Sequence, residues 1–190
     1  SVAIIYRRMV DRLSELDFDV VLFAAGVHEG SDRQFAGEAE LDVIRLPGNL
    51  DAARNIIAER GLGALIYADI GMDPFTYFLA FTRLARVQCV LAGHPVTTGI
   101  PTIDYYLTHA DLHEGDGRDR YSETLVDLPA LPNYFSRPEL PDPPAGRAAL
   151  GLEGEAALYV CPMMLFKFHP VFDAMLAGIL RRDPNGRLVL

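Results

Sequence analysis

Three short segments place polar, reactive side chains among small or flexible residues, each directly after an apolar run typical of a strand. A carboxylate can accept a proton, an imidazole can exchange one near neutral pH, and hydroxyl and lysine groups can bind an anion. These side chains are therefore candidates for ligand binding and proton transfer. The segments are DIGMDP (69–74) with Asp73, GHPVTTG (93–99) with His94, Thr97 and Thr98, and MMLFKFHP (163–170) with Lys167.

The GHPVTTG segment has a composition unusual for a plain connector. Glycines bracket it, Val96 is its one larger apolar side chain, and it brings an imidazole together with two hydroxyls. Such a segment suits a site where the backbone approaches a ligand and hydrogen-bond donors converge on an anion. The alternative for His94 is a hydrogen-bonded structural residue.

Lys167 lies just before a predicted helix that begins near Pro170. The N-terminus of a helix already carries about half a positive charge, so a lysine there is unfavourable for stability. An anionic ligand would resolve that conflict, because lysine and free helix N–H groups together bind a diphosphate well. The alternative is a lysine that reaches into solvent.

Asp73 precedes a proline at the start of another predicted helix, so a helix cap is an alternative to ligand binding, and one residue can serve both roles.

The remaining histidines show no spacing typical of a metal site, namely His28, His109, His113 and His169. The alternating segment 109–113 favours a solvated turn. No GxSxG, P-loop or GxGxxG motif occurs at a strand-to-helix turn, so an esterase, a nucleoside triphosphatase and a common dinucleotide oxidoreductase lack their best markers.

The elements around these segments alternate between strands and helices, which indicates an α/β fold. The strands read as continuous apolar runs, typical of a parallel sheet covered on both faces, and ligands of such sheets collect outside the carboxyl ends of the strands. The predicted strands cover residues 18–24, 41–46, 64–70, 87–92, 103–109, 156–163 and 186–190, and the predicted helices cover 2–16, 50–60, 74–85 and 170–182.

A proline-rich segment divides the sequence. Six prolines fall between residues 129 and 144, with little apolar periodicity, so residues 129–152 are predicted to be an interdomain linker. Residues 1–128 then form one domain, and residues 153–190 form the start of a second. The chain begins without methionine and ends on an apolar triplet, so both ends are expected to be truncated.

Composition excludes several classes of partner. The formal net charge of −9 and the pI near 4.9 disfavour nucleic acid and anionic lipid, which bind clustered lysine and arginine. No apolar run reaches the roughly 18 residues that a membrane span needs, and the first residues do not resemble a signal peptide. A cytoplasmic location is expected.

The order of these motifs resembles the O-GlcNAc transferase and bacterial HMW1C-like protein glucosyltransferase family. The resemblance rests on residues 69–111 with their IGMD and GHPVTT elements, on YSETLVDLP (121–129) and on LFKFHP (165–170), and it is closest to the HMW1C-like branch over 69–111. It extends over the chain from the opening helix to the end.

The resemblance implies two facing Rossmann-like domains of the GT-B type, the first on the acceptor side and the second holding a UDP-sugar, with transfer that is inverting and independent of metal. It implies UDP-glucose or UDP-N-acetylglucosamine as donor, a protein or peptide acceptor, and no further cofactor. Lys167 would bind the donor diphosphate and serve in catalysis with His94. Thr97 and Thr98 would lie on the donor side, and Asp73 and His94 would contact the acceptor.

Two other hypotheses stay open at this point. Met164 stands where the resemblance leads us to expect a polar contact to uridine. A catalytically silent domain that binds a protein partner would account for that departure. A nucleotide-sugar enzyme with a small-molecule acceptor would retain the fold and the donor.

Overall fold

The computed structural model describes residues 2–26, 42–113, 117–133, 135, 137, 140–152 and 154–190. The chain divides into two compact units, residues 1–136 and 137–190, and the division falls within the proline-rich segment. Two residues of the sequence analysis, His28 and Leu41, lie outside the described ranges.

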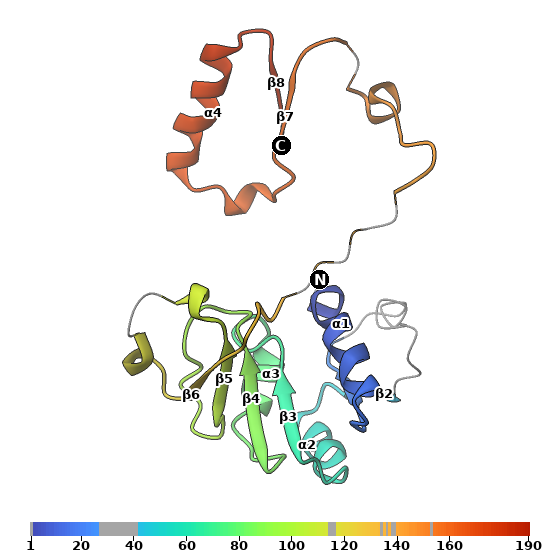
Figure 1. Cartoon of the computed structure of the whole chain (residues 1–190), viewed down its shortest axis with the longest axis vertical. Coiled ribbons are helices and arrows are strands. Elements are labelled where there is room, and N and C mark those ends of the chain that lie inside the picture. Colours follow the sequence, from blue (N-terminus) through green and yellow to red (C-terminus); the bar gives the residue numbers. More distant parts are fainter. Residues whose placement is uncertain are drawn as a thin grey trace. The chain divides into compact units, whose positions relative to one another are not determined.

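The first unit alternates helices and strands along the chain, as the apolar pattern predicts (Figure 1). Among the described residues, four strands form one parallel sheet in the order β3-β4-β5-β6, and β1 pairs with β2 in parallel. The predicted α/β class with parallel strands is confirmed. The elements are α1 (Val2–Glu15), β1 (Val21–Ala24), β2 (Asp42–Arg45), α2 (Leu50–Ala58), β3 (Ala64–Tyr67), α3 (Pro74–Leu79), β4 (Val87–Leu91), β5 (Tyr105–Thr108) and β6 (Thr124–Asp127).

The burial of the strands differs from the prediction in one respect. β4 is buried along most of its length, in agreement with its continuous apolar sequence. On β3, however, Leu65 and Tyr67 are buried while Ile66 between them is 38% exposed. Successive side chains of a strand point to opposite faces, so the prediction that both faces are covered is wrong for β3. β6 lies in a segment where no strand was predicted.

The helix predicted over 74–85 is shorter in the structure because tertiary hydrogen bonds end it. In a continuing α-helix, the Ala80 carbonyl would accept a hydrogen bond from the Leu84 N–H. The Thr102 hydroxyl donates to the Ala80 carbonyl, and the Leu84 N–H donates to Gln88 Oε1 at 2.7 Å. Both groups therefore have partners elsewhere, and α3 ends before residue 80.

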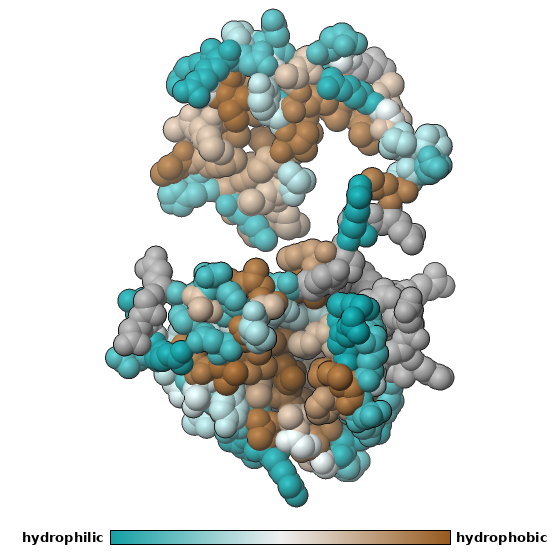
Figure 2. All heavy atoms as spheres, viewed as in Figure 1, coloured by the Kyte–Doolittle hydropathy of each residue, from teal (hydrophilic) through white to brown (hydrophobic). Residues whose placement is uncertain are grey.

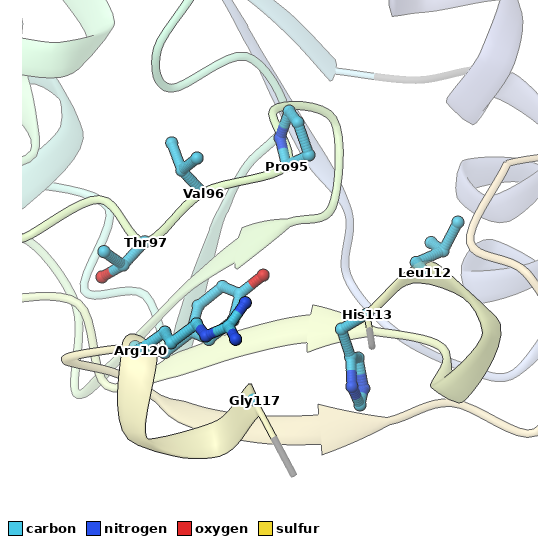
Figure 3. Close-up of a pocket in the computed structure, with 8 residues that line it drawn as sticks. Pro95, Val96, Thr97, Leu112, His113, Gly117 and Arg120 are labelled. Carbon is cyan, nitrogen blue, oxygen red and sulfur yellow. The ribbon is translucent and has the colours of Figure 1, made fainter. Parts of the chain in front are cut away.

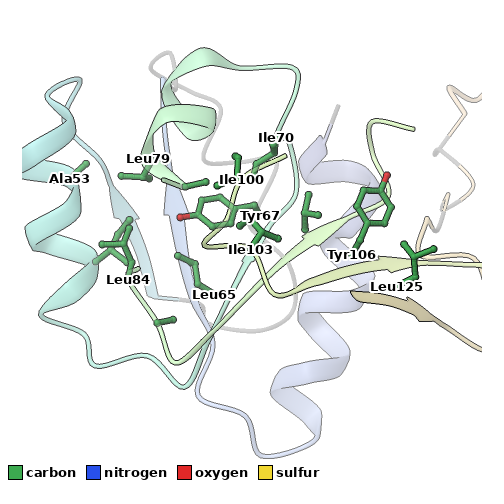
Figure 4. Close-up of a cluster of buried hydrophobic side chains, with 14 residues drawn as sticks. Ala53, Leu65, Tyr67, Ile70, Leu79, Leu84, Ile100, Ile103, Tyr106 and Leu125 are labelled. Atoms are coloured by element: carbon green, nitrogen blue, oxygen red, sulfur yellow. The ribbon is translucent and has the colours of Figure 1, made fainter. Parts of the chain in front are cut away.

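The core of the first unit is formed by side chains from α2, α3, β3, β4, β5 and β6 and from the loops that connect them (Figure 4). Its largest fully buried side chain is Tyr106 of β5, which is 1% exposed. This core fixes the strands whose ends carry the candidate site. Its members are Ala53, Ile57, Leu65, Tyr67, Ile70, Leu79, Ala80, Leu84, Ala85, Val90, Ile100, Ile103, Tyr106 and Leu125.

Gln88 is a polar side chain inside this core, and its replacement by leucine is expected to lower the free energy of unfolding by about 1–3 kcal/mol. The side chain is fully buried, and its amide nitrogen donates to the Thr102 carbonyl at 2.9 Å while its oxygen accepts from the Leu84 N–H. Leucine leaves both backbone groups buried without partners. Urea denaturation measures the loss, and the exposed neighbour Arg86, changed to alanine, is the control, with an effect within about 0.5 kcal/mol. Equal losses for both variants would contradict this role of Gln88.

The second unit contains β7 (Leu158–Val160), α4 (Pro170–Arg182) and β8 (Arg187–Val189), and β7 pairs with β8 in parallel. This strand, helix and strand order agrees with the sequence prediction. No described residue of this unit is buried, and apolar side chains reach its surface (Figure 2). Large exposed apolar residues include Val160, Met164, Leu165, Phe166 and Val171.

Candidate functional site

Two of the predicted segments meet where β3 and β4 end. A Cβ atom added to Gly71 would lie 2.8 Å from His94 Cδ2, so the imidazole packs directly against the Gly71 backbone. Gly71 also has a φ angle of +96°, which side-chain-bearing residues rarely adopt. A Cβ atom on Gly93 would lie 3.1 Å from the Ala68 carbonyl oxygen. The structure therefore brings His94 and the DIGMDP loop together at the carboxyl edge of the sheet.

Asp73 is the N-cap of α3. Its Oδ1 accepts hydrogen bonds from the backbone N–H groups of Phe75 at 2.8 Å and Thr76 at 3.2 Å, and Pro74 occupies the first turn. The helix-cap interpretation of the sequence is confirmed. Contact of Asp73 with an acceptor stays a prediction.

A second carboxyl group of this loop, Asp69, is partly buried. Burial raises the pKa of Asp69 above its usual range, a hydrogen bond with Thr76 lowers it by less, and the nearby charge of Asp73 raises it again. Asp69 therefore holds a proton more readily than an exposed aspartate does. The edge of the sheet thus offers an imidazole and a carboxyl group of raised proton affinity, two groups suited to acid–base chemistry.

The backbone of His94 is tied to the core by Tyr106. The Tyr106 hydroxyl donates a hydrogen bond to the His94 carbonyl. Burial raises the pKa of Tyr106, and the neighbouring Tyr121 and Glu123 raise it further, so this hydroxyl stays protonated and can donate at neutral pH. The His94 side chain itself is exposed. His94 thus has an anchored backbone and an accessible ring.

Thr97 and Thr98 bind an anion, but the anion is a carboxylate of the same chain. Thr97 Oγ1 donates to Glu123 Oε2 at 2.7 Å, while the Thr98 N–H, at 2.8 Å, and the Thr98 hydroxyl both donate to Glu123 Oε1. Glu123 is 5% exposed. The expectation that donors of this segment converge on an anion is therefore met inside the protein. The glutamate of the YSETLVDLP segment was not among the predicted site residues, because no local pattern marks a partner 25 residues away.

The GHPVTTG segment does not stay at the carboxyl edge along its whole length. His94 follows the end of β4, whereas Glu123 immediately precedes β6. Because β4, β5 and β6 are parallel, the hydrogen bonds to Glu123 place Thr97 and Thr98 back toward the amino end of β6, where Figure 3 shows Thr97. The segment therefore runs from the carboxyl end of β4, where His94 lies, toward the amino end of β6, where the two threonines bond to Glu123.

Lowering the pH should selectively weaken the Glu123 hydrogen bonds. Burial by itself would raise the pKa of Glu123, but the hydrogen bonds from Thr98 and Thr97 hold it below its usual value. A depressed folded-state pKa gives stability that is complete above the unfolded value, about 4.3, and is lost as the pH falls through the folded value. The unfolding free energy of the wild type minus that of Glu123→Gln should be constant from pH 7 to about pH 5 and shrink below. Urea denaturation across this range measures the difference, and a constant difference down to pH 3 would contradict it.

A cavity of about 360 Å³ borders the GHPVTTG segment (Figure 3). One wall comes from the loop after β4 and the other from the connection between β5 and β6. The cavity combines apolar side chains with an imidazole, a guanidinium and a hydroxyl, a mixture suited to part of a peptide or a sugar. Its lining residues are Pro95, Val96, Thr97, Leu112, His113, Gly117, Arg120 and Tyr121.

The histidines near this cavity have local partners. His113 Nε2 lies 2.9 Å from Asp127 Oδ1, and Arg118 donates to Asp127 Oδ2 at 2.7 Å. The hydrogen bond with His113 and the charge of Arg118 lower the pKa of Asp127. His109 Nδ1 accepts from the Asp111 N–H at 3.2 Å and caps a short 3₁₀ helix. The turn interpretation of 109–113 is supported for His109.

Lys167 belongs to the second unit and is exposed. It ends a short 3₁₀ helix (Leu165–Lys167), and its ammonium lies 6.0 Å from the ring centroid of Phe166. His169 is the N-cap of α4, accepting from the Val171 N–H at 3.3 Å. Lys167 forms no ion pair with any described residue. Lys167 is thus an exposed cation just before α4, and the binding of an anion there stays a prediction.

Two further properties concern the described part of the chain. No group of three or more histidine, cysteine, aspartate or glutamate side chains is arranged to hold a metal ion there. Within the same ranges, no helix combines the length and the apolar composition that crossing a membrane requires.

No family model matches the chain, but its sequence is similar to several named proteins. It is 36% identical over 85 residues to the UDP-glucose:protein N-beta-glucosyltransferase of Actinobacillus pleuropneumoniae serotype 5b, a match covering 44% of this chain and 13% of the relative. It is 34% identical over 110 residues to the probable UDP-N-acetylglucosamine–peptide N-acetylglucosaminyltransferase SPINDLY of Solanum lycopersicum. That match covers 57% of this chain and 11% of the relative. The probable UDP-N-acetylglucosamine–peptide N-acetylglucosaminyltransferase SEC of Arabidopsis thaliana is 32% identical to it over 114 residues. That match covers 56% of this chain and 12% of the relative.

The fold is similar to that of a mutant of the O-GlcNAc transferase from Thermobaculum terrenum, with a TM-score of 0.64 and 18% identity over 88% of this chain and 32% of the other. The sequence matches fall in both branches of the family indicated by the three segments, which confirms that resemblance. Each match spans a small part of the relative's own length.

Proposed function

We propose that the natural protein containing this chain transfers a hexose from a UDP-sugar to a protein side chain. The observation that carries the proposal is the similarity to two differently named groups of enzymes. One group is named for UDP-glucose and protein, and the other for UDP-N-acetylglucosamine and peptide. These names support UDP-glucose or UDP-N-acetylglucosamine as the donor and a protein or peptide as the acceptor. We further propose that no other cofactor takes part.

The proposed reaction is an inverting transfer without a metal ion. The acceptor oxygen or nitrogen forms a bond to the anomeric carbon of the sugar while the bond from that carbon to the UDP oxygen breaks, and the acceptor loses a proton. His94 would contact the acceptor and assist removal of its proton. Its exposed ring on an anchored backbone supports this role. Asp73, on the adjoining loop, would contact the acceptor from the other side.

On the donor side, Lys167 would bind the diphosphate. Breaking the glycosidic bond increases negative charge on the leaving UDP, and a fixed cation that meets this charge stabilises the transition state. The absence of an ion pair between Lys167 and the other described residues supports the role, as does its place before α4. Thr97 and Thr98 are proposed to form part of the wall of the donor site.

The domain organisation follows from the same proposal. Residues 1–128 would form the acceptor-side domain, and residues 153–190 would contribute to the domain that holds the UDP-sugar, with 129–152 linking them. The two domains would face each other in the GT-B arrangement. The compactness of residues 1–136 by themselves supports an independent first domain.

Intact-mass analysis of acceptor peptides tests the proposal. Peptides containing serine, threonine or asparagine are incubated with the natural protein that contains this chain. One reaction contains UDP-glucose and another contains UDP-N-acetylglucosamine. A gain of one hexose or one N-acetylhexosamine is expected and would identify the donor. Thermal stabilisation by UDP without any gain would favour a small-molecule acceptor. If neither a mass gain nor thermal stabilisation by UDP is seen, the proposal is contradicted and a silent binding domain is favoured.

A further inference from the structure

Glu123 has no role in the function proposed above, yet its buried carboxylate takes part in several hydrogen bonds. It is 5% exposed and accepts three hydrogen bonds from two consecutive residues, Thr97 and Thr98. A buried carboxylate is costly unless such bonds compensate for lost hydration. We propose that Glu123 is a positioning residue, which fixes the GHPVTTG segment so that His94 meets the acceptor in a productive geometry. This inference rests on the proposed function.

The hydrogen bonds around Glu123 form a closed network. Thr97 Oγ1, besides donating to Glu123, accepts from the Ser122 N–H at 3.1 Å and the Gly99 N–H at 3.3 Å. Thr98 Oγ1 donates to Glu123 and accepts from the Ile100 N–H at 3.1 Å. Each threonine hydroxyl therefore has its single proton directed to the carboxylate and its lone pairs directed to backbone N–H groups. In this arrangement the hydroxyls have no donor left for a ligand.

The network reaches His94 through a short, doubly anchored segment. Toward its start, the His94 carbonyl accepts from Tyr106 and the imidazole packs on Gly71. Toward its end, Glu123 holds Thr97 and Thr98. Between the anchors, Val96 is 53% exposed and lines the cavity. Releasing the later anchor would leave His94 held on one side alone, so its ring could shift relative to a bound acceptor.

The same network joins both walls of the cavity. Thr97 belongs to one wall, and Tyr121 to the other, two residues before Glu123. Ser122 lies between them and bonds to Thr97 through its N–H. Loss of the carboxylate would therefore change the spacing of the two walls, one of which continues through Pro95 into His94. A lower rate of transfer to the acceptor follows from this arrangement, while the charge proposed to bind the diphosphate, Lys167, is unchanged.

Glu123→Gln tests the proposal in the natural protein that contains this chain, because glutamine retains the size of the side chain and removes its charge. The expected result is a fall in sugar transfer of about 10- to 100-fold, since small misplacements of reacting groups cost rates of this order. The affinity for UDP, measured by calorimetry, should stay within about twofold, because no group that binds UDP changes its charge. If Glu123→Gln folds poorly, Glu123→Asp serves as a second variant with the same expectations, because the shorter side chain keeps the charge but does not reach both threonines.

Asp104→Asn is the matched control. Asp104 is also a carboxylate that immediately precedes a strand, and it accepts from Arg83 at 2.9 Å and from the Gln88 N–H at 2.8 Å, but it does not bond to the GHPVTTG segment. Its loss should lower stability and leave the transfer rate close to that of the wild type. Equal transfer by both variants would reduce Glu123 to a structural residue and overturn the proposal. Weakened UDP affinity in Glu123→Gln or Glu123→Asp would overturn it in favour of direct donor binding.

Amide hydrogen exchange separates this inference from the proposed function. Exchange of residues 93–99 should accelerate at least about tenfold in Glu123→Gln relative to Asp104→Asn, because the bonds to a charged acceptor are lost. If the wild type transfers no sugar but this acceleration is seen, the proposed function fails while the positioning of the segment by Glu123 stands. If exchange in 93–99 is unchanged, Glu123 does not position the segment, whatever the activity.

Discussion

Replacing Lys167 with alanine is expected to reduce sugar transfer by about 10²- to 10³-fold, the range typical for removing one preorganised group that stabilises transition-state charge. The ammonium forms no ion pair with the described residues and stands before the N-terminus of α4. Both the lysine and the helix N–H groups favour an anion, and the alanine variant keeps only the helix. Steady-state rates of transfer to a peptide, with either UDP-sugar, measure the effect.

Arg182→Ala is the control for the Lys167 experiment. Arg182 occupies the last turn of the same helix, is exposed, and carries the same charge. Its replacement should leave transfer unchanged, because the charge at that end is remote from the proposed diphosphate. Lys167→Ala should change the unfolding free energy by no more than about 0.5 kcal/mol, as is usual for an exposed side chain. Normal transfer by Lys167→Ala would remove the proposed contact with the donor.

Replacing Tyr106 with alanine is expected to lower the free energy of unfolding by about 3–5 kcal/mol, as deletion of a buried ring does. The ring is 1% exposed, and its centroid lies 4.8 Å from that of Tyr121. Tyr106→Phe keeps the ring and removes the hydrogen bond to the His94 carbonyl, so a smaller loss of about 0.5–1.5 kcal/mol is expected. The pair of variants separates packing from the hydrogen bond, and urea denaturation measures both.

Tyr105→Ala controls for the loss of an aromatic ring on the same strand. Tyr105 precedes Tyr106 on β5, points to the opposite face and is 38% exposed. Its loss should cost clearly less than the loss of Tyr106, because a ring that is 38% exposed gives up less buried apolar area. If Tyr105→Ala and Tyr106→Ala were equally destabilising, the core would not depend on the inward-facing ring. Tyr106→Phe should also lower transfer, since His94 loses one of its anchors.

Local sequence patterns predicted much of the fold correctly. Except for β6, the alternation of strands and helices, the N-cap at Asp73 and the helix over 170–182 follow from patterns among residues close in sequence, and the continuous apolar strands indicated a parallel sheet. Apolar periodicity and capping residues act within one or two turns, so the chain itself carries these signals. The three loop segments were also found in this way, because glycine and polar residues after an apolar run mark a strand end.

Tertiary structure decided where α3 ends and which anion the threonines bind. Ala80 and Leu84 could have continued the helix, but Thr102 and Gln88 take their hydrogen-bonding groups. Thr97 and Thr98 were predicted to face a bound donor, which stays a prediction, and in the structure Glu123 supplies a carboxylate to them from 25 residues away.

The amino-acid sequence by itself thus determined the class of fold, the elements and the residue types at the strand ends. The three-dimensional arrangement decided which of those polar groups stay available, namely the His94 ring, and which are used internally, as the threonine hydroxyls are. The physical reason is that each hydroxyl has one proton to donate and every buried polar group needs a partner. Which partner it finds depends on the approach of distant segments, and no local pattern encodes that approach.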